Sequence, residues 1–471
     1  MTIKLALPAG DARPAVGALL DRAGIPASGY EPSSRLIRSV DEERRLTLRV
    51  FREKDIPVQV AMGNYALGIC GDVWVSELQV RFPRQHVVRI GGLPGPRTSI
   101  WLCAARGSGL REGQAPGGPA LTGARIVSEF ANIADLVAVK LRIPAYRLLA
   151  VAGSADAYAP EDAELVLLPA ADPDAVRAKG LVPLARVFSG GMALIANRDA
   201  LATRDLGPVL GQLGALLELD QPSFDVPTAE ADARMERSER DRNVARLALP
   251  DGHAQRATPG NLRAAGLSFE GYDEQGYVRR PVSDLDGLTA KVVRPQDMPQ
   301  LVAIGMFDIA ITGRDLLHEH LCRFPGSPVR MAVDLGQNRY RIGPVVPEDF
   351  PAETTAEAIK LWNSLGRPVR IASEFPATAE RFALDHGLRS AAIIPVAGAS
   401  EGFVPEDADL LIEGTETGTS IRANRLKMLD PFMESTNCVI VRTEPATMRV
   451  DVIEDVIRRF ERAVSGAAVT A

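Results

Sequence analysis

Short apolar runs alternate with amphipathic stretches along the chain. In the first half, apolar runs lie at 3–8, 46–51 and 65–71, and the stretch 55–63 has helical spacing. Runs of this length between turn residues predict strands, and strands alternating with helices predict βαβ units with a parallel sheet covered by helices. Later in the chain we predict three more strands and a helix, at 369–373, 391–396, 408–412 and 376–387.

The chain repeats itself. The stretch that begins at Lys4 aligns without a gap with the one that begins at Arg246, an offset of 242. Farther along, the stretches that begin at Arg125 and Arg370 align at an offset of 245. A nearly constant offset over separate segments indicates a tandem duplication with about 220 residues in each half. The junction, 221–244, carries prolines and then many charges, which predicts a linker with a short solvated helix.

Composition excludes several classes of protein. The chain has 471 residues, of which 46% are hydrophobic and 24% charged, and this suits a globular protein with more than one domain. Its net charge of −6 and the lack of a basic stripe argue against nucleic acid as a partner. No window approaches the roughly 18 apolar residues of a membrane span. The apolar run that ends at Pro8 is too short for a signal peptide, so we expect a cytoplasmic protein.

Cysteines and histidines show no metal-binding pattern. The four cysteines contain no CxxC pair, and we predict buried free thiols in a reducing compartment: Cys70, Cys103, Cys322 and Cys438. His318 and His320 lie near a predicted exposed loop, and we interpret them as a solvated pair.

One loop in the second half carries candidate chemistry. The apolar run that ends at Ile412 leads into the eight residues Glu413–Ser420, and a predicted helix, 421–429, follows at once. Backbone N–H groups and the positive end of the helix dipole favour an anion here, and the threonine and serine hydroxyls are further donors. The acids of the loop, Glu413 and Glu416, would repel phosphate, but they could bind ribose hydroxyls or Mg²⁺. The loop therefore predicts a ribose 5-phosphate site, and a polar turn that caps a helix is the alternative.

The second half resembles the catalytic part of ATP phosphoribosyltransferase, the first enzyme of histidine biosynthesis, from about residue 245 to 442. The family signature is matched by Glu401, Pro405, Ala408-Asp409, Glu413 and Thr417-Gly418-Thr419-Ser420. Three further family motifs follow the family order, in the stretches that begin at Val292, Asp334 and Ile371. Only a helical tail, 450–464, comes after them, so the chain resembles a duplicated short form without the regulatory domain of the long form.

The resemblance implies a fold and a domain arrangement. We expect an α/β tandem duplication of a two-lobed unit of the type II periplasmic-binding-protein kind, with each lobe a mainly parallel sheet flanked by helices. The first unit, 1–220, would have lobes at about 1–105 plus 190–220, and at 106–189. The second, 245–471, would have lobes at about 245–343 plus 425–471, and at 344–424.

The resemblance also implies a reaction and its residues. N1 of ATP would attack C1 of phosphoribosyl pyrophosphate, and pyrophosphate would leave with Mg²⁺, which no protein residue need hold alone. Glu413 and Glu416 would be catalytic, through the ribose hydroxyls and the developing charge on the ring. Phosphoribosyl pyrophosphate would be bound by Asp409, Glu413, Thr415, Glu416, Thr417, Gly418, Thr419 and Ser420. ATP would be bound by Arg294, Asp315, Glu319 and Arg341.

Several of these residues have plainer alternatives. Each arginine of the ATP set could instead form a surface ion pair, and Asp297 is expected to cap a helix. A separate regulatory subunit that resembles a histidyl-tRNA synthetase, or a homo-oligomer, would be a partner by analogy with short-form relatives.

Two departures from the family pattern leave other functions open. The family's first loop is basic, whereas this chain has Asp251 at the lysine position and His253 at the arginine position, and Glu374 stands where Lys or Ser is common. In the first half the signature ends at Leu168, and we expect 18 extra residues before Gly191–Ala193 takes the place of the loop. We therefore predict one catalytic site, in the second half. The alternatives are a non-catalytic ligand-binding or regulatory paralogue and a phosphoribosyltransferase with a different acceptor.

Overall fold

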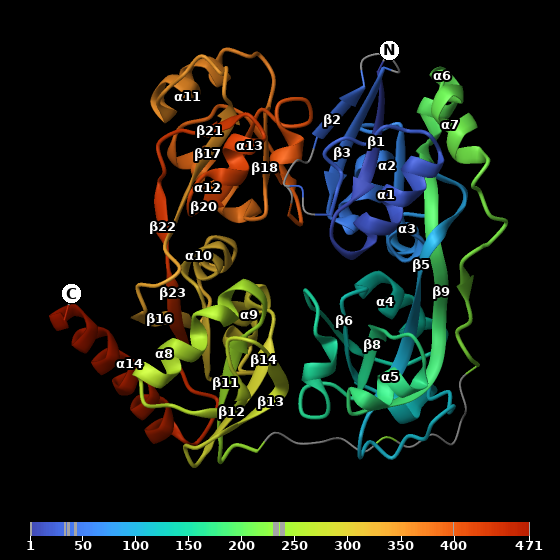
Figure 1. Ribbon diagram of the computed structural model, residues 1–471. Coiled ribbons are helices and arrows are strands. Elements are labelled where there is room, and N and C mark those ends of the chain that lie inside the picture. The colour runs from blue at the N-terminus through green and yellow to red at the C-terminus, as the bar shows by residue number, and fades with distance from the viewer. Residues whose placement is uncertain are drawn as a thin grey trace.

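Four lobes form the protein in a two-by-two arrangement (Figure 1). The structure is a computed structural model, and it describes residues 2–32, 34, 38–41, 45–228, 235, 241–398 and 400–470. We name the lobes A and B in the first half, at the upper and lower right of Figure 1, and C and D in the second half, at the lower and upper left. Lobes A and B share one sheet, lobes C and D each have a main sheet of their own, and helices cover these sheets, which confirms the predicted α/β class.

The first half contains lobes A and B. Its helices are α1 (Arg13–Arg22), α2 (Ile56–Ala61), α3 (Asp72–Arg81), α4 (Ala131–Lys140), α5 (Pro173–Ala178), α6 (Arg198–Thr203) and α7 (Gly207–Gly214). Its strands are β1 (Ile3–Pro8), β2 (Arg38–Asp41), β3 (Leu46–Phe51), β4 (Leu67–Gly71), β5 (Val87–Ala105), β6 (Arg125–Ser128), β7 (Arg147–Ala150), β8 (Leu165–Pro169), β9 (Leu181–Asn197) and β10 (Ser223–Phe224).

The second half contains lobes C and D. Its helices are α8 (Thr258–Ala264), α9 (Met298–Ala303), α10 (Arg314–Arg323), α11 (Thr355–Asn363), α12 (Pro376–Asp385), α13 (Thr419–Ala423) and α14 (Val450–Thr470). Its strands are β11 (Ala245–Pro250), β12 (Phe269–Tyr272), β13 (Tyr277–Ser283), β14 (Leu288–Val293), β15 (Ile309–Gly313), β16 (Val329–Asp334), β17 (Tyr340–Pro347), β18 (Val369–Ser373), β19 (Ala391–Pro395), β20 (Leu410–Thr415), β21 (Leu426–Met428), β22 (Met433–Ser435) and β23 (Asn437–Arg442).

The two halves connect their lobes differently. In the first half the long strands β5 and β9 pair with each other through both lobes, so one mixed sheet has the order β2-β3-β1-β4-β9-β5-β8-β6-β7. In the second half the corresponding strands are interrupted, and two sheets result, β14-β11-β15-β23-β16 and β19-β18-β20-β17-β21. One interruption is the turn between β16 and β17, where Gly336 and Asn338 both have positive φ. The lobe boundaries that we predicted remain our assignment.

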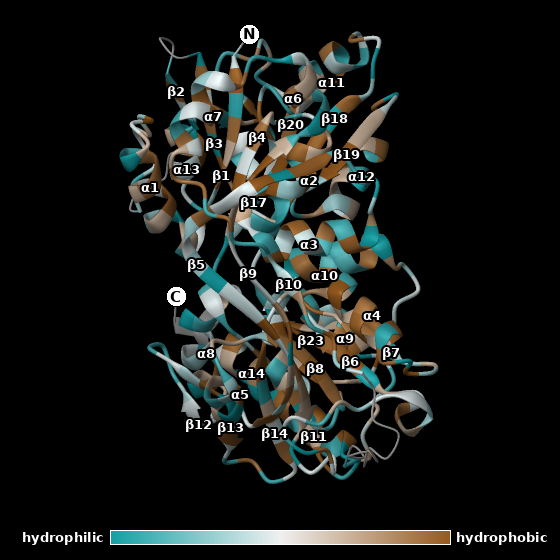
Figure 2. Ribbon diagram, turned by 90° about the vertical axis from the view of Figure 1, so that its right-hand side faces the viewer, coloured by the Kyte–Doolittle hydropathy of each residue, from teal (hydrophilic) through white to brown (hydrophobic). Residues whose placement is uncertain are grey.

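The apolar strands pack as their sequence pattern indicates. Every residue of β3, β4 and β11 is buried, and Figure 2 shows hydrophobic stretches along many of the strands. Strands covered on both faces become apolar along their whole length instead of alternating. Within the described ranges, no helix combines the length and the apolarity that a bilayer-spanning segment needs.

The predicted insertion in the first half is wrong. Ala193 pairs with Cys70 in the same way as Cys438 pairs with Thr312, so β9 corresponds to β23 at the unchanged offset of 245. Gly191–Ala193 therefore lies within a strand and not in the place of the loop. The segment 168–175 aligns without a gap with 413–420, and α5 is the counterpart of α13.

The structure also corrects three other local predictions. The predicted helix 421–429 ends at Ala423, because Arg425 takes a positive φ and the chain then pairs as β21 with β17. Asp297 does not cap its own helix, since its carboxylate accepts the N–H of Ala152 at 2.9 Å in the other half. His318 lies on α10, half-buried, and is not part of a solvated pair.

Three further predictions have outcomes in the described residues. Three of the four cysteines are buried and all four are free thiols, but Cys322 is partly exposed. Residues 229–234 and 236–240 of the predicted linker, 221–244, fall outside the described residues, and 223–224 near its start pair as β10 with β9. The predicted C-terminal helix is confirmed as α14.

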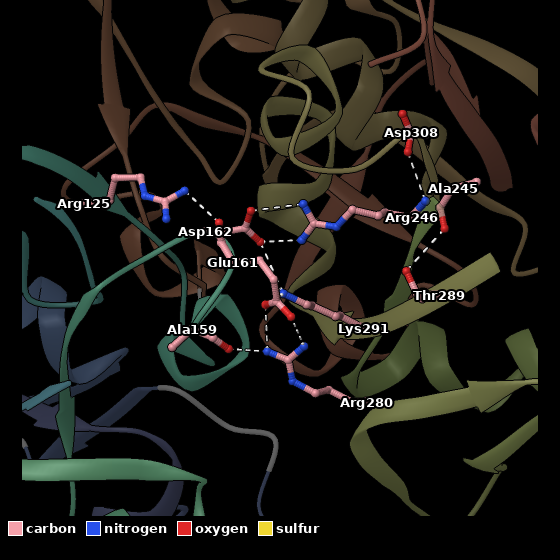
Figure 3. Close-up of polar contacts among 10 residues, drawn as sticks. All are labelled: Arg125, Ala159, Glu161, Asp162, Ala245, Arg246, Arg280, Thr289, Lys291 and Asp308. Atoms are coloured by element: carbon pink, nitrogen blue, oxygen red, sulfur yellow. Dashed lines mark hydrogen bonds and ion pairs between the residues drawn. The ribbon is translucent and has the colours of Figure 1, made fainter. Parts of the chain in front are cut away.

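The halves bind each other head to tail. Lobe A packs against lobe D, and lobe B packs against lobe C, so that two apolar clusters cross between the halves. Polar contacts repeat with the sequence offsets: Lys4 meets Asp407 at 3.1 Å, and their counterparts Arg246 and Asp162 meet at 2.6 Å. The same duplication places Lys291 and Arg280 on Glu161 at 2.7 and 2.9 Å (Figure 3). One chain thus forms a pseudo-symmetric dimer of its own halves.

Candidate active site

The loop between β20 and α13 opens towards lobe C. Gly418 has a φ of 70° and directly precedes α13, and a Cβ there would lie 2.8 Å from a guanidinium nitrogen of Arg422. The N–H of Gly418 donates to Thr415 Oγ1 at 2.8 Å, and the hydroxyls of Thr417 and Thr419 contact each other at 2.8 Å. Among the described residues, no side chain caps α13, so its first N–H groups are available to an anion.

Glu413 lies at the base of this loop. Its carboxylate accepts the N–H of Gly414 at 2.9 Å and contacts the hydroxyl of Ser400. Burial, followed by the neighbouring Glu374, raises the pKa of Glu413 to about 8. Hydrogen-bond donors stabilise the charged form of a carboxyl group in this environment, and a pair of ribose hydroxyls would supply two such donors.

The first half reaches this cleft with cations. Gly398, with a φ of 127°, lies between Arg52 of lobe A and Glu374, and a Cβ on it would be 2.7 Å from a side-chain atom of each. The side chain of Glu374 is solvent-accessible, but the walls of the cleft desolvate it and raise its pKa, and Arg52 opposes this shift. Arg52 and Lys54 therefore place positive charge beside the acids of the loop.

Two other predicted ligands of phosphoribosyl pyrophosphate lie apart from this group. Asp409 precedes β20, at the opposite end of the strand from the loop, and pairs with Arg367 and Arg370 at 2.7 and 3.1 Å. These hydrogen bonds lower the pKa of Asp409 to about 2 in spite of its burial. Glu416 is exposed at the tip of the loop, 3.4 Å from His253 of lobe C. Both assignments stay predictions, but the contacts of Asp409 indicate a structural ion pair.

The four residues that we predicted for ATP are dispersed. Arg341 lies beside the loop, because β17 pairs it with Thr415. Asp315 is buried between the lobes, where it accepts a hydrogen bond from Ser435 Oγ at 2.8 Å. Glu319 accepts the N–H groups of Ala377 and Thr378 at 2.9 and 2.8 Å, so it joins α10 of lobe C to the start of α12.

Arg294, the fourth of these residues, faces the first half. It contacts Asp251 at 3.3 Å and lies against Gly153, the counterpart of Gly398. By the offset of 242, Arg294 corresponds to Arg52, so each half extends one arginine into the cleft of the other. Sequence reasoning missed Arg52, although that same offset already linked it to Arg294.

The position of Asp251 distinguishes these two arginines. Asp251 is buried, and it also accepts a hydrogen bond from Ser154 at 3.3 Å, so it does not face the second-half cleft. The matching residue in the first half is Ala9, which has no carboxylate to hold Arg52. Arg294 is thus paired with Asp251 at the first-half cleft, whereas Arg52 has no carboxylate at the matching position and lies beside Glu374 in the second-half cleft.

The first-half counterpart of the loop is closed to an anion. Leu168 replaces Glu413, and Asp172 caps α5 by accepting the N–H of Ala175 at 2.8 Å. A carboxylate therefore already occupies the helix start where the second half leaves it open.

No group of three or more metal-ligating side chains occurs among the residues that the structure describes.

Comparisons with known proteins agree with the duplication. The family model for ATP phosphoribosyltransferase matches twice, at residues 52–215 and 294–462. An ATP phosphoribosyltransferase from Chlorobium chlorochromatii is 30% identical over 206 residues, which are 43% of this chain and 64% of that protein. Another, from Chelativorans sp., is 30% identical over 205 residues, which are 41% of this chain and 89% of that protein.

The solved ATP phosphoribosyl transferase (HisG:HisZ) complex from Thermotoga maritima is 21% identical, with a TM-score of 0.37, over 47% of this chain and all of the matched chain. The match to the Chlorobium chlorochromatii relative, at 64%, spans less than two thirds of that relative's length. With a family match in each half that together cover most of the sequence, the chain belongs to the ATP phosphoribosyltransferase family.

Proposed function

We propose that the second half transfers the phosphoribosyl group of phosphoribosyl pyrophosphate to ATP, and that the first half has lost this chemistry. One observation carries the proposal: no side chain among the described residues caps α13 in the second half, whereas Asp172 caps its counterpart α5 in the first. The family membership of both halves supports the choice of reaction.

The geometry supports a mechanism without a protein nucleophile. The hydroxyls of the loop and the start of α13 would bind the 5-phosphate, and Glu413 would accept the ribose hydroxyls. Arg52, with Lys54 beside it, would stabilise the negative charge that develops on the leaving pyrophosphate. Catalysis then rests on alignment of two bound anions and on preorganised charge. A regulatory subunit of the histidyl-tRNA-synthetase-like kind remains a proposed partner.

One observation favours a different acceptor as a second candidate. The position where the family has a lysine gives the cleft no cation, because Asp251 occupies it and is buried against Ser154 of the first half. The carboxyl of Glu374 lies inside the cleft, so the cleft is less suited to a triphosphate than its loop is to a 5-phosphate. Measuring product formation from ATP together with phosphoribosyl pyrophosphate binding separates the two candidates. A different acceptor would leave phosphoribosyl pyrophosphate binding intact while ATP gives no product.

We expect the purified chain to convert ATP and phosphoribosyl pyrophosphate, with Mg²⁺, to phosphoribosyl-ATP and pyrophosphate. Arg52→Ala should lower kcat/KM by roughly 10²-fold, the size of effect seen when one transition-state donor is removed. Arg294→Ala is the matched variant, and since Asp251 holds Arg294 we expect a much smaller change. A larger effect of Arg294→Ala would instead support its predicted role in ATP binding, and no binding of either substrate would refute the proposal.

We expect the protein to release a proton from Glu413 when phosphoribosyl pyrophosphate binds at neutral pH. The pKa of Glu413, about 8, keeps its carboxyl protonated in the free protein, and ribose hydroxyls would favour the charged form. Because the folded pKa is raised from 4.5, the free protein loses stability as the pH rises from 4.5 through about 8, and the ligand restores it. Calorimetry in two buffers of different ionisation enthalpy measures the proton. Equal binding heats in both buffers, or unchanged release in Glu413→Gln, would contradict this role.

A further inference from the structure

A second cavity lies between the lobes of the second half. Helices α10 and α12 pack side by side, and between them and β22 lies a cavity of about 730 Å³ that is open to solvent. Each helix presents residues at spacings of three and four, so one face of each helix lines it. The lining includes Arg314, Leu317, His318, Leu321 and Cys322 of α10, Thr378, Arg381, Phe382 and Asp385 of α12, and His386 directly after α12.

This cavity is separate from the loop site. It opens on the face of the lobe D sheet that packs with α12, where Ile412 of β20 and Phe432 are part of the core. The neighbouring Leu411 and the first residue of α13 to be buried, Ile421, belong instead to the cluster shared with the first half. The sheet thus stands between the cavity and the candidate active site.

Both lobes build the wall of the cavity. Glu319 holds the start of α12 through Ala377 and Thr378, which fixes the spacing of the two helices. The floor is apolar and aromatic: the rings of Phe382 and His386 lie 4.3 Å apart, and those of Phe382 and Phe432 5.3 Å apart. A ligand in this cavity would contact lobe C and lobe D together.

The charge of the lining is mainly positive. Arg314 and Arg381 contribute cations: Arg314 lies 4.0 Å from Asp334, which is outside the lining, and Arg381 pairs with Asp385 of the lining at 2.8 Å. The carboxylate of Glu319 is committed to α12. Two cations above an aromatic floor favour an organic anion whose body is apolar.

The first half shows that the scaffold does not require these side chains. Glu77 accepts the N–H groups of Asn132 and Ile133 at 2.8 and 2.9 Å, as Glu319 does for α12, so the link between the lobes is retained. The residues that correspond to the polar lining differ, however: Arg314, His318, Arg381 and His386 are matched by Asp72, Ser76, Leu136 and Leu141. The cationic lining is therefore specific to the half that has the open loop.

We propose that this cavity binds a small aromatic or aliphatic carboxylate, held by Arg314 and Arg381 over the Phe382–Phe432 floor, and that the ligand ties lobe C to lobe D. The site is independent of the proposed reaction, since its ligand contacts none of the loop residues.

Cys322 provides a direct reporter of occupancy. It lines the cavity and is the partly exposed member of four cysteines, all of which the structure describes. The uncharged reagent 2,2′-dithiodipyridine labels a thiol by disulfide exchange: the thiolate attacks one sulfur, a mixed disulfide forms and one pyridinethione leaves. The rate of labelling at Cys322, followed by peptide mass spectrometry, then reports whether a ligand fills the cavity.

We expect 4-nitrobenzoate at about 10 mM to slow the labelling of Cys322 several-fold, and the isosteric 4-nitrobenzamide not to do so, as a weak anion site requires. The double variant Arg314→Gln/Arg381→Gln should lose this protection. Arg323→Gln on the same helix, whose guanidinium lies over Phe324 and outside the lining, should keep it.

Leu321→Trp tests the cavity itself, because it fills the space and leaves both arginines in place. It should slow labelling without any ligand and abolish the effect of 4-nitrobenzoate. Equal protection by the carboxylate and the amide, no protection by either, or protection that persists in the double variant would each overturn the proposal.

Discussion

Replacement of Thr415–Ser420 by the six residues of 170–175 is expected to abolish phosphoribosyl pyrophosphate binding and to leave the fold intact. The two segments align without a gap, and both lead from a strand into a short helix, so the exchange preserves chain length and topology. It brings the carboxylate of the Asp172 position to the start of α13, where it would take the N–H group intended for phosphate. We expect kcat/KM to fall by at least about 10³-fold, since several transition-state contacts are lost together.

The limits of the exchanged segment follow from the packing of the loop. Gly414 must stay, because a Cβ there would lie 2.6 Å from the ring of Tyr340, and the first half has a proline at that position. The reciprocal exchange, which places the six second-half residues at 170–175, is the control. It should fold but gain no transfer activity, because Asp251 still holds Arg294 at that cleft. Retained binding in the first exchange would remove the loop from the mechanism.

Asp162→Ala is expected to have the largest effect on stability. Asp162 is fully buried between the halves, where it accepts hydrogen bonds from both terminal nitrogens of Arg246 at 3.1 and 2.6 Å and from Lys291 at 3.3 Å (Figure 3). Its removal leaves the buried guanidinium of Arg246 without this carboxylate, and Lys291 keeps its pair with Glu161. Breaking a buried pair in this way costs about 3–5 kcal/mol of unfolding free energy.

Urea unfolding followed by circular dichroism measures this cost. Asp174→Ala is the matched control, since its pair with Arg177 is exposed and worth less than about 1 kcal/mol. The stability that Glu161 contributes to this network should be lost only as the pH falls towards about 2, because the donors around Glu161 lower its pKa to that value. Similar losses in the two variants would show that the halves do not depend on this network.

Sequence patterns predicted the duplication, the strands and the loop because each depends on local spacing. The constant offset also predicted which residues are equivalent, up to Leu168. The error came after Leu168, where Gly190 and Gly191 resemble a turn. Both lie within β9: Gly190 packs against Asp72, and the N–H of Gly191 donates to the Asp72 carboxylate at 3.2 Å. A glycine that allows the close approach of another element cannot be distinguished by sequence from one that makes a turn.

Contacts between the halves could not be predicted from the sequence, for a different reason. Arg52 and Arg294 lie in the same motif, and the motif alone assigns both to their own cleft. The structure assigns each to the opposite cleft, because lobe A packs on lobe D and lobe B on lobe C. Asp297 likewise binds Ala152 of the other half instead of its own helix. Roles that arise from packing of distant segments need the tertiary structure.

The number of phosphoribosyl pyrophosphate molecules bound by each chain tests the central claim most directly. Titration calorimetry with Mg²⁺ present should show one site per chain, and the exchange at Thr415–Ser420 should remove that site. Two sites per chain, or one site that survives the exchange, would contradict the assignment of a single working cleft to the second half.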